Sequence, residues 1–197
     1  MFKEAERNLI KANDLCSRSK NVIHHGVANK GLGDNYIEMG DFLRGKTYYQ
    51  KAIEIFEQNR LLPSTWLALA KVGWVRAKVR NREKDIDLES LFPLSRNVKL
   101  KAFEGSILSY IGEILLNIDD LHMPQAEEYI QKAINSDQKN GMKYHLGNDY
   151  ALYADLFKRK GDRLKAQENL GKAIEILKEC GADGWVEKYE KDLAGLS

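Results

Sequence analysis

The segment Gly40–Thr47 has the residue types and the spacing that phosphate binding requires. It reads GDFLRGKT, which satisfies the pattern of a nucleotide-binding P-loop. In such a loop the glycines let backbone N–H groups surround phosphate, the lysine contacts the outer phosphates and the threonine holds magnesium. That geometry needs a buried strand directly before the loop, whereas the preceding KGLGDNYIEM spaces its polar residues as an amphipathic helix does. An NTP-binding enzyme that uses Gly40–Thr47 is therefore kept as the alternative hypothesis.

The other residues that could do chemistry are isolated. His24 and His25 are adjacent, and neighbouring side chains on a helix diverge by about 100°, so they do not converge on one ion. Gly31-x-Gly33 lacks the third glycine of a dinucleotide site. The remaining candidates belong to no metal or nucleophile motif: His122, His145, Cys16 and Cys180. We therefore expect no catalytic residue, no metal and no cofactor.

Basic residues concentrate between Lys71 and Lys84, where six charged residues are positive and only Glu83 is negative. One interpretation is a solvated helix face whose basic end lies at the negative end of the helix dipole. The other is a patch for an anionic partner with Trp74 as its apolar anchor. Acidic residues follow from Asp85 onward and would neutralise such a patch.

The charge and hydropathy of the whole chain exclude other partners. Lys and Arg total 31 and Asp and Glu total 29, so the net charge of +2 creates no field for nucleic acid or an anionic membrane. No apolar run approaches the roughly 18–20 residues of a membrane helix. The N-terminus, MFKEAERNLIKAND, lacks the apolar core of a signal peptide. We expect no nucleic-acid or membrane partner and a cytoplasmic location.

The sequence contains an internal repeat, and the repeated segments are the elements that would position these residues. A Lys-Ala pair recurs in four similar segments, and its alanines are spaced 40, 81 and 40 residues apart: Ala12, Ala52, Ala133 and Ala173. A small residue lies seven positions before each: Ala5, Gly45, Ala126 and Ala166. The interval of 81 corresponds to two periods, with one copy blurred near residues 85–92.

These segments are predicted to be helical. Ala5, Leu9, Ala12 and Leu15 form one stripe near a period of 3.6 residues. Gly40-Asp41 and Gly161-Asp162 suit a left-handed helix end followed by an N-cap. We predict no strands, and Pro63, Pro93 and Pro124 are placed at helix starts or breaks. The expected helices lie near 2–19, 25–39, 42–58, 64–81, 86–92, 99–117, 124–136, 142–160, 163–180 and 183–194.

The spacing of the small and aromatic residues is similar to that of a known repeat family. The stretch Asn29-x-x-Leu32-Gly33-x-x-Tyr36, followed by Gly40-Asp41, Gly45, Tyr49 and Ala52, resembles the tetratricopeptide (TPR) repeat. So does Tyr150-x-x-Tyr153-Ala154-x-x-Phe157, followed by Gly161-Asp162, Ala166, Leu170 and Ala173. The resemblance implies an all-α, right-handed superhelical solenoid of antiparallel helix hairpins, with repeats of about 40 residues and a C-terminal capping helix.

The whole chain, 1–197, is predicted to be a single TPR-like domain. It is divided into a half repeat at 1–20, repeats at about 21–60, 61–98, 99–138 and 139–180, and a capping helix at 182–195. The N-terminal helix has no partner before it, so Leu9, Ile10 and Leu15 would lack one neighbour. That open end suggests either a fragment of a longer protein or a homodimer through the N-terminal helix.

The C-terminal part is similar to the ends of TPR regions in large bacterial signalling proteins, in which an ATPase or nucleotide-cyclase domain precedes the repeats. The resemblance implies a non-catalytic protein-interaction scaffold that serves as the sensory or regulatory region of such a protein. In this family the first helices of successive hairpins line a concave groove for a protein or peptide partner. Helix geometry then selects its side chains: Lys30, Asp34, Glu38, Lys71, Trp74, Lys78, Tyr110, Glu113, Asn117, Asp155 and Arg159.

Overall fold

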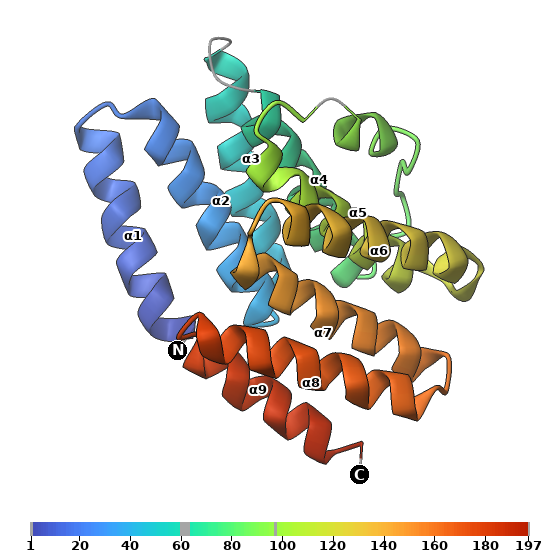
Figure 1. The fold of residues 1–197 in the computed structure, drawn as a ribbon. Coiled ribbons are helices and arrows are strands. Elements are labelled where there is room, and N and C mark those ends of the chain that lie inside the picture. Colours follow the sequence, from blue (N-terminus) through green and yellow to red (C-terminus); the bar gives the residue numbers. More distant parts are fainter. Residues whose placement is uncertain (1, 60–63, 97, 197) are drawn as a thin grey trace. The chain divides into compact units, whose positions relative to one another are not determined.

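The computed structural model describes residues 2–59, 64–96 and 98–196. Contacts divide the chain into two compact units, residues 1–100 and residues 101–197, and each is described by itself. The described residues form helices, turns and irregular segments with no strand (Figure 1). The predicted all-α fold of antiparallel helix hairpins is therefore confirmed.

The described part of unit 1 contains four α-helices of 17 residues each: α1 (Phe2–Arg18), α2 (Val22–Glu38), α3 (Phe42–Gln58) and α4 (Ser64–Arg80). Each packs against the next one along the chain, and α2 also packs against α4. Gly40 follows α2 with φ of +78°, a left-handed conformation that is costly for other residues. Asp41 then caps α3, because its Oδ1 accepts a hydrogen bond from the Arg44 amide at 3.1 Å.

Unit 2 repeats the same plan. Its helices are α5 (Glu104–Ile118), α6 (Met123–Lys139), α7 (Lys143–Arg159), α8 (Arg163–Glu179) and α9 (Asp183–Ala194), with short 3-10 turns η2 (Lys101–Phe103) and η3 (Asp120–His122). Three of the connections contain a glycine with positive φ: Gly141, Gly161 and Gly181. Asp162 caps α8 as Asp41 caps α3. The two Gly-Asp breaks predicted from the sequence are thus both confirmed.

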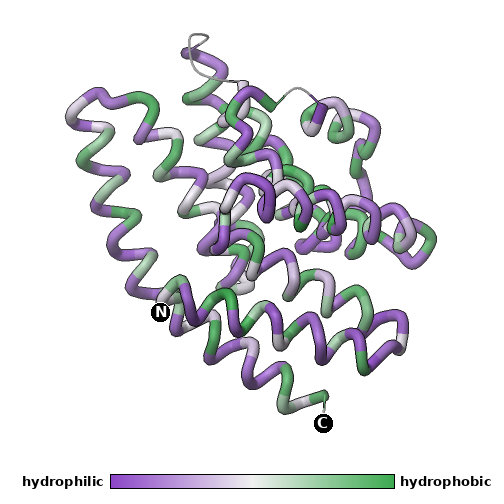
Figure 2. Tube along the Cα trace, in the orientation of Figure 1, coloured by the Kyte–Doolittle hydropathy of each residue, from purple (hydrophilic) through white to green (hydrophobic). Residues whose placement is uncertain are grey.

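The repeated small residues lie where helices pack most closely. Ala52, Ala133 and Ala173 are fully buried. A Cβ atom added to Gly45 would lie 3.2 Å from the carbonyl oxygen of Gly33, so α3 and α2 meet almost backbone to backbone. Figure 2 shows the corresponding alternation of apolar and polar stretches along the helices. The first repeated alanine, Ala12, is only half-buried, because α1 packs against α2 alone.

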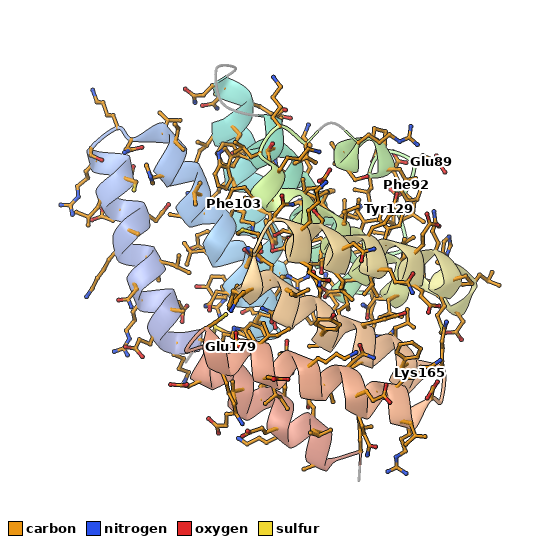
Figure 3. The ribbon with its side chains drawn as sticks, in the orientation of Figure 1. Glu89, Phe92, Phe103, Tyr129, Lys165 and Glu179 are labelled. Carbon is orange, nitrogen blue, oxygen red and sulfur yellow. The ribbon has the colours of Figure 1, made fainter. Side chains whose placement is uncertain are left out.

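The helix predicted at 86–92 is wrong. Residues 81–91 form turns and bends, and the first regular element after α4 is the 3-10 helix η1 (Phe92–Ser95), near the Glu89 and Phe92 labels of Figure 3. Ser90 bonds locally to Asp87, its amide to Oδ1 at 3.3 Å and its hydroxyl to the carbonyl oxygen at 3.0 Å. Such local hydrogen bonds compete with those of a helix.

Another boundary differs from the prediction. The helix expected at 99–117 begins only at Glu104, after the 3-10 turn η2. The segment after α4 is instead held by buried Leu91 and Val98, and the Leu100 amide donates to the Thr65 hydroxyl at 3.2 Å. Pro124 lies in the first turn of α6 and Pro93 in the first turn of η1, as predicted. Pro63 lies outside the described residues.

Glycines in unit 2 provide a test of close packing. A Cβ atom at Gly147 on α7 would lie 2.6 Å from Cγ of the buried Leu177 on α8. Gly147→Ala should therefore lower the free energy of unfolding by about 1–3 kcal/mol through overpacking. Chemical denaturation followed by circular dichroism measures this change.

Gly171→Ala on α8 is the matched control, because nothing lies within 4 Å of a Cβ atom at Gly171. Alanine there should raise the free energy of unfolding by about 0.5–1 kcal/mol through its better helix propensity. Equal effects of the two substitutions would contradict this account of the α7–α8 contact.

Candidate functional site

The P-loop-like segment is a turn between two helices. Gly40 ends α2, and the residues from Phe42 onward belong to α3. The Lys46 amine lies 2.5 Å from a carboxylate oxygen of Glu83, and the Thr47 hydroxyl donates to the Leu43 carbonyl oxygen at 3.0 Å. A helix rather than a strand leads into the segment, so its backbone N–H groups are not arranged as phosphate binding requires.

The predicted groove residues of α2 form a polar row. The Lys30 amine lies 2.7 Å from Oδ2 of Asp34, and Oδ1 of Asp34 accepts a hydrogen bond from the Tyr49 hydroxyl. One turn further, Glu38 pairs with Arg76 of α4 at 2.8 Å. Residues four apart share a helix face, which explains why the three lie together.

Arg76 is a residue of this row that sequence reasoning did not select. It is only 6% exposed and reaches Glu38 from α4. In the sequence it belongs to the basic run from Lys71 to Lys84, where nothing distinguishes it from its exposed neighbours. A buried guanidinium needs a carboxylate partner, and only the α2–α4 packing shows that this partner is Glu38.

The other predicted residues of α4 make different contacts. The Lys71 amine lies 2.8 Å from Glu57 of α3. The Lys78 amine lies 4.9 Å from the centroid of the Trp74 ring and donates to the Asp85 carbonyl oxygen at 2.5 Å. Lys71 thus contacts α3 and Lys78 contacts the segment after α4, whereas Arg76 contacts the polar row on α2.

In unit 2 the predicted residues gather around Arg159. Its guanidinium donates to the Leu116 carbonyl oxygen at 2.5 Å, to Oδ1 of Asn117 at 3.0 Å and to Oδ2 of Asp155 at 3.0 Å. The amide of Asn117 donates in turn to the Glu113 carbonyl oxygen at 2.7 Å. Arg159 therefore satisfies the end of α5 from α7, where helix carbonyl groups have no partner within the helix. Of the other residues predicted on α5, Glu113 is buried and Tyr110 is half-buried.

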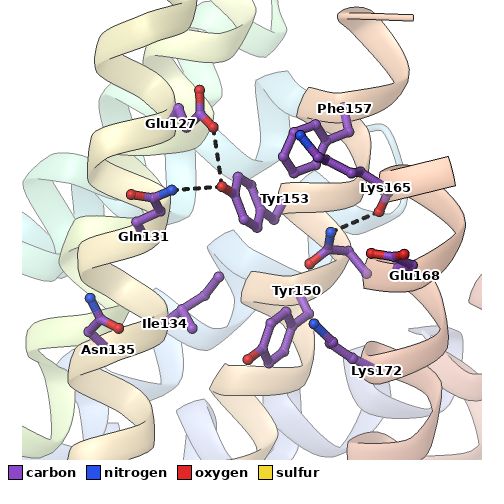
Figure 4. A pocket seen from close by; sticks show the side chains of 11 residues that line it. Glu127, Gln131, Ile134, Asn135, Tyr150, Tyr153, Phe157, Lys165, Glu168 and Lys172 are labelled. Carbon is purple, nitrogen blue, oxygen red and sulfur yellow. Dashed lines mark hydrogen bonds between the residues drawn. The ribbon is translucent and has the colours of Figure 1, made fainter. Parts of the chain in front are cut away.

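A hollow of about 640 Å³ lies elsewhere on unit 2, over α6, α7 and α8 (Figure 4). None of its residues was predicted as part of the groove. Aromatic side chains of α7 lie between polar side chains of the other two helices. The lining residues are Glu127, Gln131, Ile134, Asn135, Tyr150, Tyr153, Phe157, Lys165, Glu168, Asn169 and Lys172. The TPR-like spacing of Tyr150, Tyr153 and Phe157 is the signal of these residues in the sequence, and it indicates a repeat rather than a binding surface.

Hydrogen bonds orient the centre of this hollow. The Tyr153 hydroxyl accepts from Nε2 of Gln131 at 2.7 Å and donates to Oε1 of Glu127 at 3.2 Å. The ion pair with Lys160 holds the pKa of Glu127 below its ordinary value. Burial, reinforced by the charge of Glu127, raises the pKa of Tyr153. The Tyr153 hydroxyl is therefore a neutral group fixed from α6.

Lysines border the same aromatic side chains. The Lys165 amine lies 5.1 Å from the centroid of the Phe157 ring, and the Lys172 amine lies 5.6 Å from that of Tyr150. A cation within about 6 Å of an aromatic face is attracted by the ring electrons. Both lysines are exposed, so they can leave the rings to meet a carboxylate of a partner.

Among the described residues, no group of three or more His, Cys, Asp and Glu side chains could hold a metal ion. His24 lies 2.9 Å from Asn21, and His122 lies 2.8 Å from Asp119, so each contacts the residue three positions before it. No described helix is both long and apolar enough to span a membrane.

The N-terminal helix α1 makes polar contacts with α2. The amide of Asn29 donates to Asn13 at 2.6 Å, and the Tyr36 hydroxyl donates to Glu6 at 2.5 Å. Leu15 is 59% exposed and Ile10 is 45% exposed. The homodimer through this helix stays a prediction.

The comparisons with known proteins agree with this geometry. Residues 31–59, which cover the end of α2 and all of α3, match the tetratricopeptide repeat. The match supports a TPR-type domain. The fold is similar to the crystal structure of BtubC (BKLC) from P. vanneervenii, with a TM-score of 0.61 and 15% sequence identity over 100% of this chain and 83% of that chain. No curated protein sequence matches the chain.

Arg159 provides a test of the α5–α7 contact. Arg159→Ala should lower the free energy of unfolding by about 1 kcal/mol, because three hydrogen bonds are lost at a partly exposed site. Urea denaturation measures the change. Lys158→Ala is the control, since Lys158 is exposed on the preceding position of the same helix. A loss of stability as large in the control would show that the hydrogen bonds of Arg159 do not stabilise unit 2.

Proposed function

We propose that this chain is a non-catalytic scaffold that binds a helical or extended segment of a partner protein. Tetratricopeptide repeats suggest a protein-interaction scaffold, and residues 31–59 match one. The single observation that carries the proposal is the hollow over α6, α7 and α8, where the half-buried side chains of Tyr150 and Tyr153 lie between polar walls and Phe157 is buried beside them.

The chemistry of the hollow suits a peptide better than a small reactive substrate. Tyr150 and Tyr153 offer apolar area with few rotatable bonds, and aromatic residues are enriched among the residues that dominate interface energies. Asn135, Gln131 and Asn169 offer amide groups for hydrogen bonds to a peptide backbone. No activated nucleophile lies among the lining residues.

The predicted groove is a second candidate surface. Its side chains on α2 and α7 are engaged in ion pairs and hydrogen bonds within the chain. A partner would have to replace those contacts, whereas at the hollow it would have to displace water and move the exposed Lys165 and Lys172 off the aromatic rings. This difference favours the hollow as the place where a partner gains most binding energy.

We further infer, from the resemblance of the C-terminal part, that the scaffold is the sensory or regulatory region of a larger bacterial signalling protein in the cytoplasm. An open reading frame that continues upstream of Met1 into an ATPase or nucleotide-cyclase domain would support this context. A gene that encodes no such domain would contradict it and leave the scaffold proposal standing.

Partner binding is tested with variants of the hollow. A pull-down with the intact chain supplies the partner, and calorimetry measures its affinity. Tyr150→Ala should weaken binding at least tenfold, and Lys172→Glu should weaken binding of an acidic segment, because both residues line the hollow. Lys158→Glu, an exposed lysine outside the hollow, is the control for charge reversal.

Circular dichroism confirms that each variant is folded. Unchanged affinity of both hollow variants would refute this surface as the binding site. Loss of binding on Lys71→Glu alone would assign the site to α4 instead.

The enzyme alternative is tested with nucleotide. Titration of ATP with Mg²⁺ should give no binding, because a helix leads into Gly40–Thr47 and Lys46 pairs with Glu83. Lys46→Ala should cost less than about 1 kcal/mol of stability, since the ion pair is partly exposed. Tight ATP binding that disappears in Lys46→Ala would overturn the non-catalytic proposal.

A further inference from the structure

Two aspartates face each other in the core of unit 2. Asp137 of α6 is 0% exposed and Asp149 of α7 is 1% exposed. Their carboxyl groups lie within hydrogen-bonding reach of each other, and the Ser109 hydroxyl of α5 bonds to Asp149. If both side chains are ionised carboxylates, both oxygens of Asp137 and Oδ2 of Asp149 have no hydrogen-bond donor.

Comparison between hairpins shows that an apolar residue is the rule at the position of Asp137. A Cβ atom at Gly26 would lie 2.3 Å from the Phe56 ring, and one at Gly147 would lie 2.6 Å from Leu177. The equivalent glycine of the middle hairpin, Gly105, faces Asp137 instead, with a Cβ position 1.9 Å from Oδ1.

Asp149 departs from the other hairpins in the same way. It lies two residues after Gly147, whereas the equivalent positions in the other hairpins hold Ala28 and Ile107, both buried. Close packing therefore does not require either carboxyl group. The two acidic residues contact each other, which indicates that they act as a pair.

A single bound proton would satisfy the hydrogen bonding of the pair and remove the repulsion between its two charges. Two carboxylates can only accept hydrogen bonds, so as a doubly ionised pair they repel and neither satisfies the other. If one carboxyl group is protonated, its O–H donates to the other, and only one negative charge is buried. Burial raises the pKa of Asp137 to about 6, and burial together with the charge of Asp137 raises the pKa of Asp149 well above its ordinary value.

We propose that Asp137 and Asp149 form a proton-binding site in the core of unit 2, and that the packing of α5, α6 and α7 depends on the proton. The site is distinct from the hollow, because neither aspartate lines it. Gly105 and Ser109 bring α5 to the pair, so electrostatic repulsion after loss of the proton acts on all three helices.

The direction of the pH effect follows from linkage. The folded-state pKa values of both aspartates lie above the ordinary value of 3.8, so the folded chain binds more protons than the unfolded chain. The contribution to stability is complete below about pH 4 and is lost as the pH rises through about 6 and beyond. Across that window the unfolding constant should rise by about tenfold per pH unit for each extra proton bound.

Other titratable or charged groups on the helices that pack around the pair must be separated from it. Lys101 and Glu104 pair with each other at 2.7 Å at the start of α5, and Lys143 pairs with Glu179 at 2.7 Å between α7 and α8. Further charged or titratable groups on these helices include Glu113 on α5, Lys139 on α6 and His145, which lies one turn before Asp149 on α7. Histidine side chains ordinarily change charge between about pH 5 and 8, so His145 needs its own control.

Urea denaturation of the full chain between pH 5 and pH 9 tests the proposal. The wild type should lose stability as the pH rises, with the tenfold change per pH unit given above. Asp137→Asn should flatten this dependence, because the amide can donate to Asp149 without titrating. His145→Gln should keep the wild-type dependence.

Parallel curves for the wild type and Asp137→Asn would overturn the proposal, and so would loss of the dependence in His145→Gln. If Asp137→Asn does not fold, Asp149→Asn and NMR titration of ¹³C-labelled aspartate carboxyl groups in the wild type take its place. Two aspartates that titrate far above pH 4 support the proton site, and ordinary titration of every aspartate refutes it. Partner affinity is not part of this readout, so the result is independent of the proposed function.

Discussion

Helix backbones in both units approach most closely at residues that carry little or no side chain. Gly45 of α3 meets the backbone of α2 at Gly33, and Gly147 of α7 receives the buried Leu177 of α8. Small residues at these points set the distance between paired helices, and that distance decides which larger side chains meet in the core. The polar rows, the aromatic hollow and the buried aspartates all occupy places that these contacts define.

The distance between helices determines what polar side chains do in two ways. Where helices are close, charges satisfy one another inside the chain, as Arg76 does with Glu38 and as Arg159 does with the end of α5. Where α6 and α8 stand apart over α7, aromatic side chains stay accessible between polar walls. A partner gains binding energy from surface that is not already paired, so the separation of helices, more than the number of charges, marks a candidate binding surface.

The pair Asp137–Asp149 stands out against this background because it places charge where other hairpins place Phe56, Leu177, Ala28 or Ile107. Buried carboxyl groups cost free energy, and apolar residues of similar size would pack at the same positions. A helical repeat allows this comparison within one chain, because each hairpin shows which residue can pack at the equivalent position of the others. The acids therefore mark a property of unit 2 beyond its packing.

The sequence by itself determined the helices and their hairpins, because alanine and glycine recur at the period of an amphipathic helix and Gly-Asp pairs end one helix and cap the next. It did not reveal that residues 81–91 form turns and bends instead of a helix, since local bonds such as those between Ser90 and Asp87 depend on conformation. Only the tertiary structure paired Arg76 with Glu38, opened the hollow and joined Asp137 to Asp149. Periodicity within one helix identifies its buried face, whereas the partner of a buried side chain depends on how different helices pack.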